Sequence, residues 1–143
     1  YKGMGWQHES RDFANVKQFV ENCHKHQVRV LAYVQFSTLY YETMLAEIPE
    51  LADWAAVDEN GRKRTYHSAY YRWLPCMNAP GFEPYLKKVM RIALTEGGFD
   101  GIMFDNCGSP ACYCPRCAPA PASATTPLAG RWRVCCCCNS SPG

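Results

Sequence analysis

The sequence predicts an α/β fold with a parallel sheet, and two observations carry that prediction. Two helical patterns alternate with two short apolar runs, in the order helix, strand, long connection, helix, strand. This alternation is typical of parallel strands that are joined by helices. The apolar runs 28–35 and 101–104 have almost no polar face, which favours strands that are buried on both sides.

The first helix is predicted over 13–25. Apolar residues recur there at spacings of three and four, from Phe13 to Cys23, and this places them on one face of a helix. Asp12 is a candidate N-cap. Residues 1–9 contain glycines and aromatic residues without a clear period, so we expect an irregular loop there.

The connection after the first strand is unusually long. Between 36 and 81 it shows a short helix at 40–47 that Pro49 ends, a helical turn at 51–54, an Asn-Gly turn at 58–61, and a loop or small hairpin at 62–71. In a compact domain, a connection of this length is usually functional.

The second helix is predicted over 82–96, with Pro84 in its first turn, where proline is tolerated. Gly97 and Gly98 end this helix, because glycine accepts the left-handed conformation that follows a helix. The second strand, 101–104, comes after a short link.

Length and charge narrow the function. With 143 residues and a net charge of +2, the chain can form one domain and gives no reason to expect nucleic acid or a membrane as a partner. No apolar stretch reaches the roughly 20 residues of a membrane span. Residues 1–117 form the predicted domain, whereas 118–143 lack acidic residues and periodicity and are expected to be a disordered or spurious tail.

The ten cysteines are unevenly distributed. Only Cys23 and Cys76 precede the second predicted strand, and this favours a reduced, cytoplasmic chain with a metal site over a secreted chain held by disulfides. The four adjacent cysteines 135–138 cannot all point at one ion, and we interpret them as accidental.

A second group of cysteines has metal-binding spacing. Cys112, Cys114 and Cys117 are spaced as thiolates that wrap around one zinc ion, which takes four ligands in structural sites. Either Cys107 or Cys76 can supply the fourth ligand. A set of free thiols in a loop is the plain alternative.

A carboxylate directly follows the second apolar run. Asp105 is at the carboxyl end of the predicted strand, where α/β enzymes place catalytic groups, although an aspartate there can also brace a loop. Tyr33 and Gln35 end the first strand and either line the same face or belong to the core. His8 and Arg72 lie in predicted loops that can reach this face. Polar and aromatic side chains of this kind suit sugars, which offer ring faces and hydroxyl groups.

Together these segments resemble the TIM-barrel glycoside hydrolases, above all the hypothetical glycosyl hydrolase 6 family and the family 42 β-galactosidases. The resemblance covers roughly residues 1–117 and rests on 13–35, the Leu39-Tyr40-Tyr41-Glu42 run, Trp54, the turn at 58–61, 72–78 and 98–106. It implies a partial (β/α)8 TIM barrel, since a complete barrel needs about 250 residues. The two strands look like the third and fourth of eight.

The resemblance also implies site residues. The Cys-Tyr-Cys-x-x-Cys run, with an earlier cysteine after an Arg-containing loop, is similar to the zinc cluster of family 42, and this selects Cys76 as the fourth ligand. Family 42 enzymes carry Asn-Glu at the end of the fourth strand, with the glutamate as general acid/base. Here the residues are Asp105-Asn106. Asp105 is therefore a candidate nucleophile or acid/base, and Asn106 a candidate substrate contact.

The implied function is hydrolysis of an O-glycosidic bond in a carbohydrate, with a structural zinc ion and a parent protein that can be a homo-oligomer. Such hydrolysis uses two carboxylates. Asp105 is the one convincing candidate, and Glu9, Glu42 and Glu47 are poorer ones, so we expect the chain alone to be inactive. The rival hypothesis is a small, non-catalytic zinc-binding interaction module.

Overall fold

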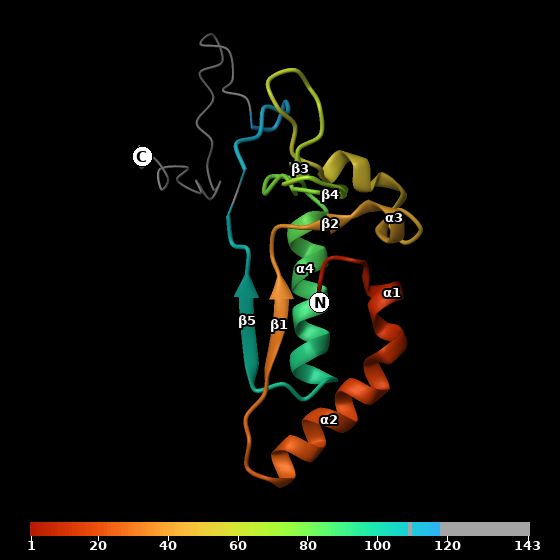
Figure 1. Cartoon of the computed structure of the whole chain (residues 1–143), viewed down its shortest axis with the longest axis vertical. Coiled ribbons are helices and arrows are strands. Elements are labelled where there is room, and N and C mark those ends of the chain that lie inside the picture. Colours follow the sequence, from red (N-terminus) through yellow and green to blue (C-terminus); the bar gives the residue numbers. More distant parts are fainter. Residues whose placement is uncertain (109, 118–143) are drawn as a thin grey trace.

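The computed structural model describes residues 1–108 and 110–117, so the predicted tail at 118–143 lies outside the described residues (Figure 1). The fold is a mixed α/β arrangement. Within the described residues, no helix combines the length and the apolarity of a membrane span. The elements in chain order are α1 (Trp6–Glu9), η1 (Ser10–Asp12), α2 (Phe13–Lys25), β1 (Leu31–Gln35), β2 (Leu39–Tyr40), α3 (Tyr41–Met44), η2 (Pro49–Trp54), β3 (Thr65–Tyr66), β4 (Ala69–Trp73), α4 (Phe82–Thr95) and β5 (Gly101–Asp105).

The two predicted strands lie side by side and parallel, which confirms the helix–strand alternation. β1 and β5 pair from Leu31 and Gly101 to Gln35 and Asp105, and their arrows point the same way in Figure 1. The Phe36 N–H extends this ladder to the Asp105 carbonyl oxygen at 2.9 Å. Both strands therefore end at the same edge of the sheet.

The backbone of Tyr1 borders β1 on its other edge. The Tyr1 amino group donates to the Tyr33 carbonyl oxygen at 2.7 Å, and the Gln35 N–H donates to the Tyr1 carbonyl oxygen at 2.8 Å. One residue that bonds in this way to two alternate residues of its neighbour has the hydrogen-bond pattern of a parallel strand. The Tyr1 backbone thus continues the parallel hydrogen-bond pattern on the second edge of β1.

Helix α4 packs against both strands and runs alongside them (Figure 1). It buries Phe82, Leu86 and Val89, which recur at helical spacings, while α2 buries Val20. The link to β5 begins where Gly98 adopts a φ of 72°, the left-handed conformation predicted for the end of this helix.

The N-terminal segment corrects two predictions. Trp6–Glu9 form helix α1 and not an irregular loop, and Asp12 makes no capping hydrogen bond because the chain is already helical before it. The cause is tertiary. The Gln7 N–H, which is free at the start of α1, donates to the carboxylate of Glu47 at 2.9 Å. Local sequence does not reveal a partner that is so distant in the chain.

The β1–α4 connection, residues 36–81, folds over the carboxyl ends of the strands. β2, β3 and β4 form a small antiparallel sheet in the order β2-β4-β3, which confirms the hairpin alternative for this region, and α3 and η2 lie beside it in the upper half of Figure 1. Leu39, Met44 and Leu51 are fully buried here. The connection is therefore a packed part of the domain that can hold side chains in fixed positions.

The prediction that both strands are buried on both faces is wrong for the described residues. Leu31, Met103 and Phe104 are 58%, 48% and 44% exposed. In the described part of the chain, β5 has a hydrogen-bonded neighbour on one edge only, so less of its surface is covered than in a larger parallel sheet. An apolar run marks a strand without showing which of its faces other elements cover.

Candidate functional site

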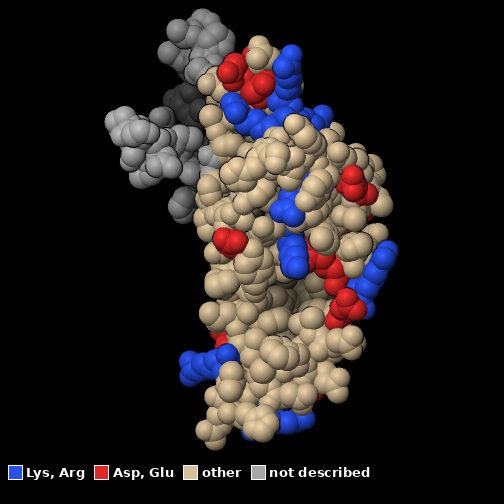
Figure 2. Space-filling view, viewed as in Figure 1, with Lys and Arg blue, Asp and Glu red and all other residues tan. Residues whose placement is uncertain are grey.

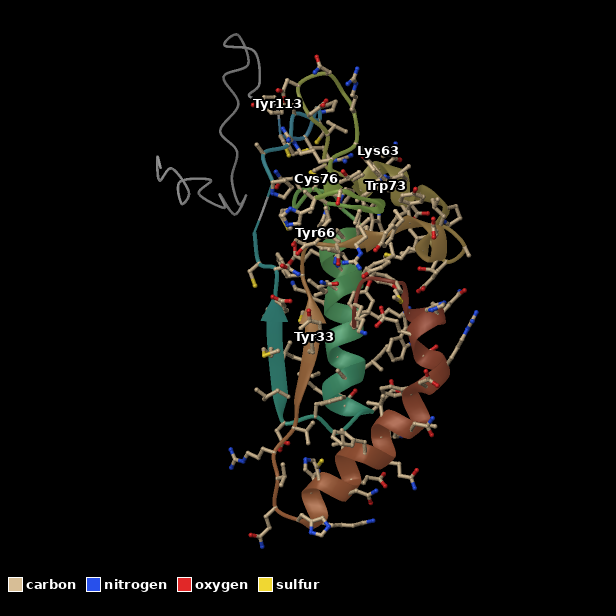
Figure 3. The ribbon with its side chains drawn as sticks, in the orientation of Figure 1. Tyr33, Lys63, Tyr66, Trp73, Cys76 and Tyr113 are labelled. Carbon is tan, nitrogen blue, oxygen red and sulfur yellow. The ribbon has the colours of Figure 1, made fainter. Side chains whose placement is uncertain are left out.

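Four cysteine thiols meet beyond the carboxyl ends of the strands, near the labelled Cys76 in Figure 3. The Sγ atoms of Cys76, Cys112, Cys114 and Cys117, here called the cysteine cluster, all lie within 4.8 Å of one another. Cys76 Sγ is 3.7 Å from Cys114 Sγ and 3.4 Å from Cys117 Sγ. Tetrahedral zinc, with Zn–S distances of about 2.3 Å, keeps its ligand sulfurs about 3.8 Å apart, so the donor set fits one such ion.

Two segments that are distant in sequence supply these thiols. Cys76 comes just after β4, and its N–H donates to the Trp54 carbonyl oxygen at 2.7 Å. The other three thiols follow β5, where the Cys117 N–H donates to the Cys114 carbonyl oxygen at 2.8 Å. The β1–α4 connection therefore folds back over the strand ends, which is what the choice of Cys76 requires.

The structure separates the two candidates for the fourth thiol. Cys76 is 1% exposed and belongs to the cluster, whereas Cys107 is exposed and lies outside it. The predicted convergence of Cys76 with the other three cysteines is confirmed.

The surroundings determine which thiol loses its proton most readily. Burial raises the pKa of Cys76. Burial also acts to raise the pKa of Cys114, but hydrogen bonds from the Cys112 thiol and the Arg116 N–H lower it to about 7. The Asn78 side-chain amide donates to Cys117 Sγ at 3.2 Å. Since a thiolate is the form that binds a metal, the cluster offers one near neutral pH.

The carboxylate of Asp105 is held at the same end of the sheet. The Tyr33 hydroxyl donates to its Oδ2 at 2.5 Å, the Asn106 N–H to its Oδ1 at 2.8 Å, and the Asn106 side-chain amide to its Oδ2 at 3.4 Å. The hydrogen bond to Asp105 raises the pKa of Tyr33, so the phenol keeps its proton and stays a donor. Tyr33 therefore orients the carboxylate.

Asn106 links this carboxylate to the β1–α4 connection. Its backbone has a φ of 55°, a left-handed conformation that asparagine tolerates better than most residues. Its side-chain oxygen accepts a hydrogen bond from the Tyr66 hydroxyl at 3.1 Å, and its carbonyl oxygen accepts one from the Ser37 hydroxyl. The sequence alone did not predict a role for Tyr66 or Ser37. The one feature that pointed toward Tyr66 is the polar and aromatic character of the segment 62–71. We call Tyr33, Asp105, Asn106 and Tyr66 the strand-end cluster.

Arg72 lies beside the strand-end cluster, on β4. Its guanidinium carbon is 4.3 Å from the ring centre of Tyr40, 5.1 Å from that of Tyr71 and 5.8 Å from that of Tyr66. Tyr40 is directly opposite Arg72 in the pairing of β2 with β4, which explains the shortest distance. One side chain, Tyr66, thus connects this predicted substrate contact to Asn106.

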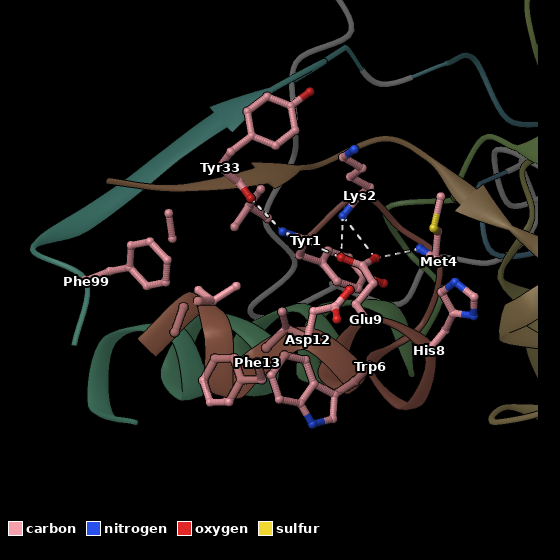
Figure 4. Close-up of a pocket in the computed structure, with 15 residues that line it drawn as sticks. Tyr1, Lys2, Met4, Trp6, His8, Glu9, Asp12, Phe13, Tyr33 and Phe99 are labelled. Carbon is pink, nitrogen blue, oxygen red and sulfur yellow. Dashed lines mark hydrogen bonds and ion pairs between the residues drawn. The ribbon is translucent and has the colours of Figure 1, made fainter. Parts of the chain in front are cut away.

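Two other predicted substrate contacts, Gln35 opposite Asp105 in the strand pairing and His8, are not part of the strand-end cluster. Gln35 is buried, and its side-chain oxygen accepts a hydrogen bond from the Thr38 hydroxyl at 2.9 Å, so it fixes the turn after β1. His8 is on α1 and lines a cavity of about 440 Å³ between the N-terminal helices and β1 (Figure 4). Neither Asp105 nor a cysteine of the cluster lines that cavity. A role in substrate binding stays a prediction for both residues.

The poorer candidates for a second carboxylate are used elsewhere. Glu9 accepts the backbone N–H groups of Lys2 and Met4. Glu47 holds the start of α1 and also accepts a hydrogen bond from the Tyr85 hydroxyl at 3.0 Å. Glu42 is exposed on α3. Within residues 1–108 and 110–117, the hydrogen-bonded strand-end cluster contains one carboxylate.

Comparison with known proteins adds one match. The sequence model of the family described as hypothetical glycosyl hydrolase 6 matches residues 2–106. That span includes α2, α4, both parallel strands and Asp105, and it stops before the three cysteines of the cluster that follow β5. No curated protein matches the chain.

Proposed function

Because the chain belongs to the hypothetical glycosyl hydrolase 6 family, we propose that it forms part of a (β/α)8-barrel enzyme that hydrolyses O-glycosidic bonds. Three features of the fold support the barrel. β1 and β5 are parallel neighbours, α4 packs against both, and the Tyr1 backbone extends the parallel pattern on the other edge of β1. We also propose that, among glycoside hydrolases, this enzyme is related to the family 42 β-galactosidases.

The observation that carries the enzymatic role is the position of Asp105. Its carboxylate lies at the carboxyl end of a parallel strand, which is the end where barrel enzymes place catalytic groups. Both of its oxygens accept hydrogen bonds, as suits an ionised carboxylate. We therefore assign Asp105 the role of nucleophile, and Tyr33 and Asn106 the role of holding it in place.

In this role, Asp105 attacks the anomeric carbon of the sugar. A bond forms from a carboxylate oxygen to that carbon while the bond to the leaving-group oxygen breaks, and a second carboxylic acid gives its proton to the leaving oxygen. Water then hydrolyses the glycosyl ester. Arg72 and the tyrosines around it contact the sugar. The strand-end cluster supplies one of the two carboxylates, so the second comes from another part of the barrel.

The cysteine cluster is proposed to hold a structural zinc ion. Four thiolates fill all four positions of tetrahedral zinc, which leaves none for a substrate or a reactive water. A bound zinc ion would serve as a cross-link between the two segments that carry the cysteines. Cys76 and the three later cysteines thereby fix the β1–α4 connection to the segment after β5, and so hold Tyr66 and Arg72 near Asp105.

Sugar binding at the strand ends tests the proposed function. In an NMR titration of the 143-residue chain with methyl galactosides and methyl glucosides, we expect the ring signals of Tyr66 and the side-chain amide signals of Asn106 to shift, since neither residue lines the His8 cavity. Asp105→Asn should weaken this response, whereas Asp12→Asn, an exposed residue beside the other cavity, should not. Shifts confined to residues around His8 would contradict the proposal.

The rival hypothesis, a non-catalytic zinc-binding interaction module, leaves part of the structure unexplained. A module organised by the cysteine cluster alone has no need for the hydrogen bonds that join Tyr33, Asp105 and Asn106. If the chain binds one zinc ion and no sugar, this rival becomes the better account.

A further inference from the structure

We propose that the strand-end site takes an acidic sugar, one that carries a carboxylate or a sulfate ester, and that Arg72 binds this anionic group. The inference rests on the proposed carbohydrate function and adds the chemical class of the substrate. Arg72 is a half-buried cation on β4.

Comparison with two other arginines shows what is unusual about Arg72. Arg64, Arg72 and Arg116 each have a buried Nε atom without a hydrogen-bond partner. Arg64 still donates to the Glu59 carboxylate at 3.3 Å, and Arg116 to the Asp53 carbonyl oxygen. Within the described residues, Arg72 is the one of the three whose guanidinium has neither a hydrogen bond nor an ion pair. A cation that loses part of its water and gains no acceptor is unfavourable until a ligand supplies one.

The position of Arg72 is nevertheless fixed. The rings of Tyr40, Tyr66 and Tyr71 surround its guanidinium at 4.3, 5.8 and 5.1 Å from the ring centres. Such contacts stabilise the positive charge, but they leave the in-plane N–H donors without acceptors. A guanidinium held in this way is preorganised to bind a planar or branched oxyanion with two parallel hydrogen bonds.

The surroundings suit a sugar acid better than a free ion. Tyr66 donates to Asn106, which in turn holds the carboxylate of Asp105, so the anion site and the proposed nucleophile are neighbours. Tyrosine rings around Arg72 offer faces on which a pyranose can stack. Basic side chains also gather over the β1–α4 connection at the top of Figure 2, with a smaller acidic group beside them. A neutral sugar offers the guanidinium hydroxyl acceptors but no opposite charge, so the half-buried cation should favour the acidic sugar over its neutral partner.

Matched pairs of ligands test this inference on the 143-residue chain. The pairs are methyl glucuronide with methyl glucoside and methyl galacturonide with methyl galactoside, which differ only in the carboxylate, and glucose 6-sulfate tests the sulfate alternative. With the tyrosine ring and arginine Nε–H signals as readout, the acidic member should bind about tenfold or more tightly than its neutral partner. Arg72→Gln should remove the difference, and Arg72→Lys should keep part of it. Arg62→Gln, an exposed arginine of the same connection, should leave it unchanged.

Each other outcome overturns the inference. If acidic and neutral sugars bind equally and Arg72→Gln weakens both, Arg72 contacts hydroxyl groups, and the proposed carbohydrate function survives without the acidic specificity. If acetate or inorganic sulfate binds as tightly as the sugar acids, the site is a simple anion site. If no sugar binds, both proposals fail together. Should Arg72→Gln not fold, the matched pairs on the unmodified chain decide the question alone.

Discussion

Asp100 and Asp105 lie at opposite ends of β5, and their carboxylates have similar hydrogen bonds. Asp100 Oδ2 accepts the Val30 N–H at 2.7 Å and pairs with His24 Nε2 at 2.9 Å. Asp105 likewise has a backbone N–H at 2.8 Å and one ring donor, a tyrosine hydroxyl, at 2.5 Å. His24, an exposed residue near the end of α2, thus joins this helix to the start of β5.

The two aspartates differ in what lies around them. The partners of Asp100 are His24 near the end of α2 and Val30 just before β1. These hydrogen bonds hold successive elements of the fold together. Asp105 is hydrogen-bonded to Asn106, and Asn106 accepts a hydrogen bond from Tyr66 of the β1–α4 connection, which lies beside Arg72. The same connection supplies Cys76 to the cysteine cluster. Hydrogen bonds alone thus do not distinguish a structural carboxylate from the proposed nucleophile. The end of the strand does, because the long connection folds over the carboxyl end.

The largest effect should come from the cysteine cluster, the proposed zinc site, which lies beyond the carboxyl ends of the strands. We expect one zinc ion per chain and its loss in Cys76→Ser, because structural zinc in small domains contributes about 10 kcal/mol to folding. Hydrogen exchange should then increase around Asp105 much more than around Asp100. Cys107→Ser is the matched control and should keep full stoichiometry in metal analysis. A chain that keeps zinc without Cys76 and loses it without Cys107 would refute the proposed ligand set.

The next largest effect concerns catalysis. The 143-residue chain should show no appreciable hydrolysis of aryl glycosides, because loss of a general acid alone costs about 10²–10⁴ in rate and most of the proposed barrel is absent. Release of the coloured phenol is the measurement. Robust hydrolysis that is lost in Asp105→Asn and kept in Asp100→Asn would overturn this expectation, and would show that the partner carboxylate lies within the chain.

A smaller effect should come from removing the aromatic side chain that donates a hydrogen bond to each aspartate, Tyr33 for Asp105 and His24 for Asp100. Tyr33→Phe removes one donor to the Asp105 carboxylate, and we expect sugar binding to weaken about fivefold, which corresponds to roughly 1 kcal/mol for one hydrogen bond. His24→Phe removes the corresponding donor to Asp100 and should lower the midpoint of urea unfolding without affecting the sugar titration. The comparison fails if His24→Phe weakens sugar binding as much as Tyr33→Phe does.

The smallest effect is a pH dependence at the amino end. Hydrogen bonds from the Val30 N–H and His24 hold the pKa of Asp100 below its usual value of 3.8. Because the folded-state pKa is the lower one, this carboxylate stabilises the fold above about pH 4 and ceases to do so as pH falls through the folded-state pKa. Urea unfolding should therefore show the chain to be more stable than Asp100→Asn at pH 6, with the difference shrinking below pH 4. A constant difference would rule out this linkage.

The sequence predicted the features that depend on local pattern. Alternating helical stripes and apolar runs were enough to predict that β1 and β5 are parallel neighbours. The spacing of Cys112, Cys114 and Cys117 pointed to a shared ion, and the family resemblance added Cys76, which does join them. These features are readable because each is repeated or concentrated within a few residues.

Other features depend on partners that are distant in the chain. The carboxylate of Glu47 accepts one of the free N–H groups at the start of helix α1. Asn106 is held by a hydrogen bond from Tyr66 of the small antiparallel sheet. Gln35 turns out to brace Thr38, and His8 lines a different cavity. No local period encodes such contacts, since they arise only when the β1–α4 connection packs over the strand ends.

The meeting of Cys76 with the three later cysteines also has a consequence for the unfolded chain. A cross-link through these thiols closes a ring of roughly 36 residues, and for a ring of that length the chain-entropy treatment of cross-links gives a loss of about 4 kcal/mol from the unfolded ensemble. The ring contains α4 and β5, whose partner strand β1 lies far back in the sequence. Contacts between such distant strands form slowly because a long loop must close first. Metal binding before the sheet forms would keep α4 and β5 together in one compact ring, and so reduce the conformational search that precedes their docking on β1.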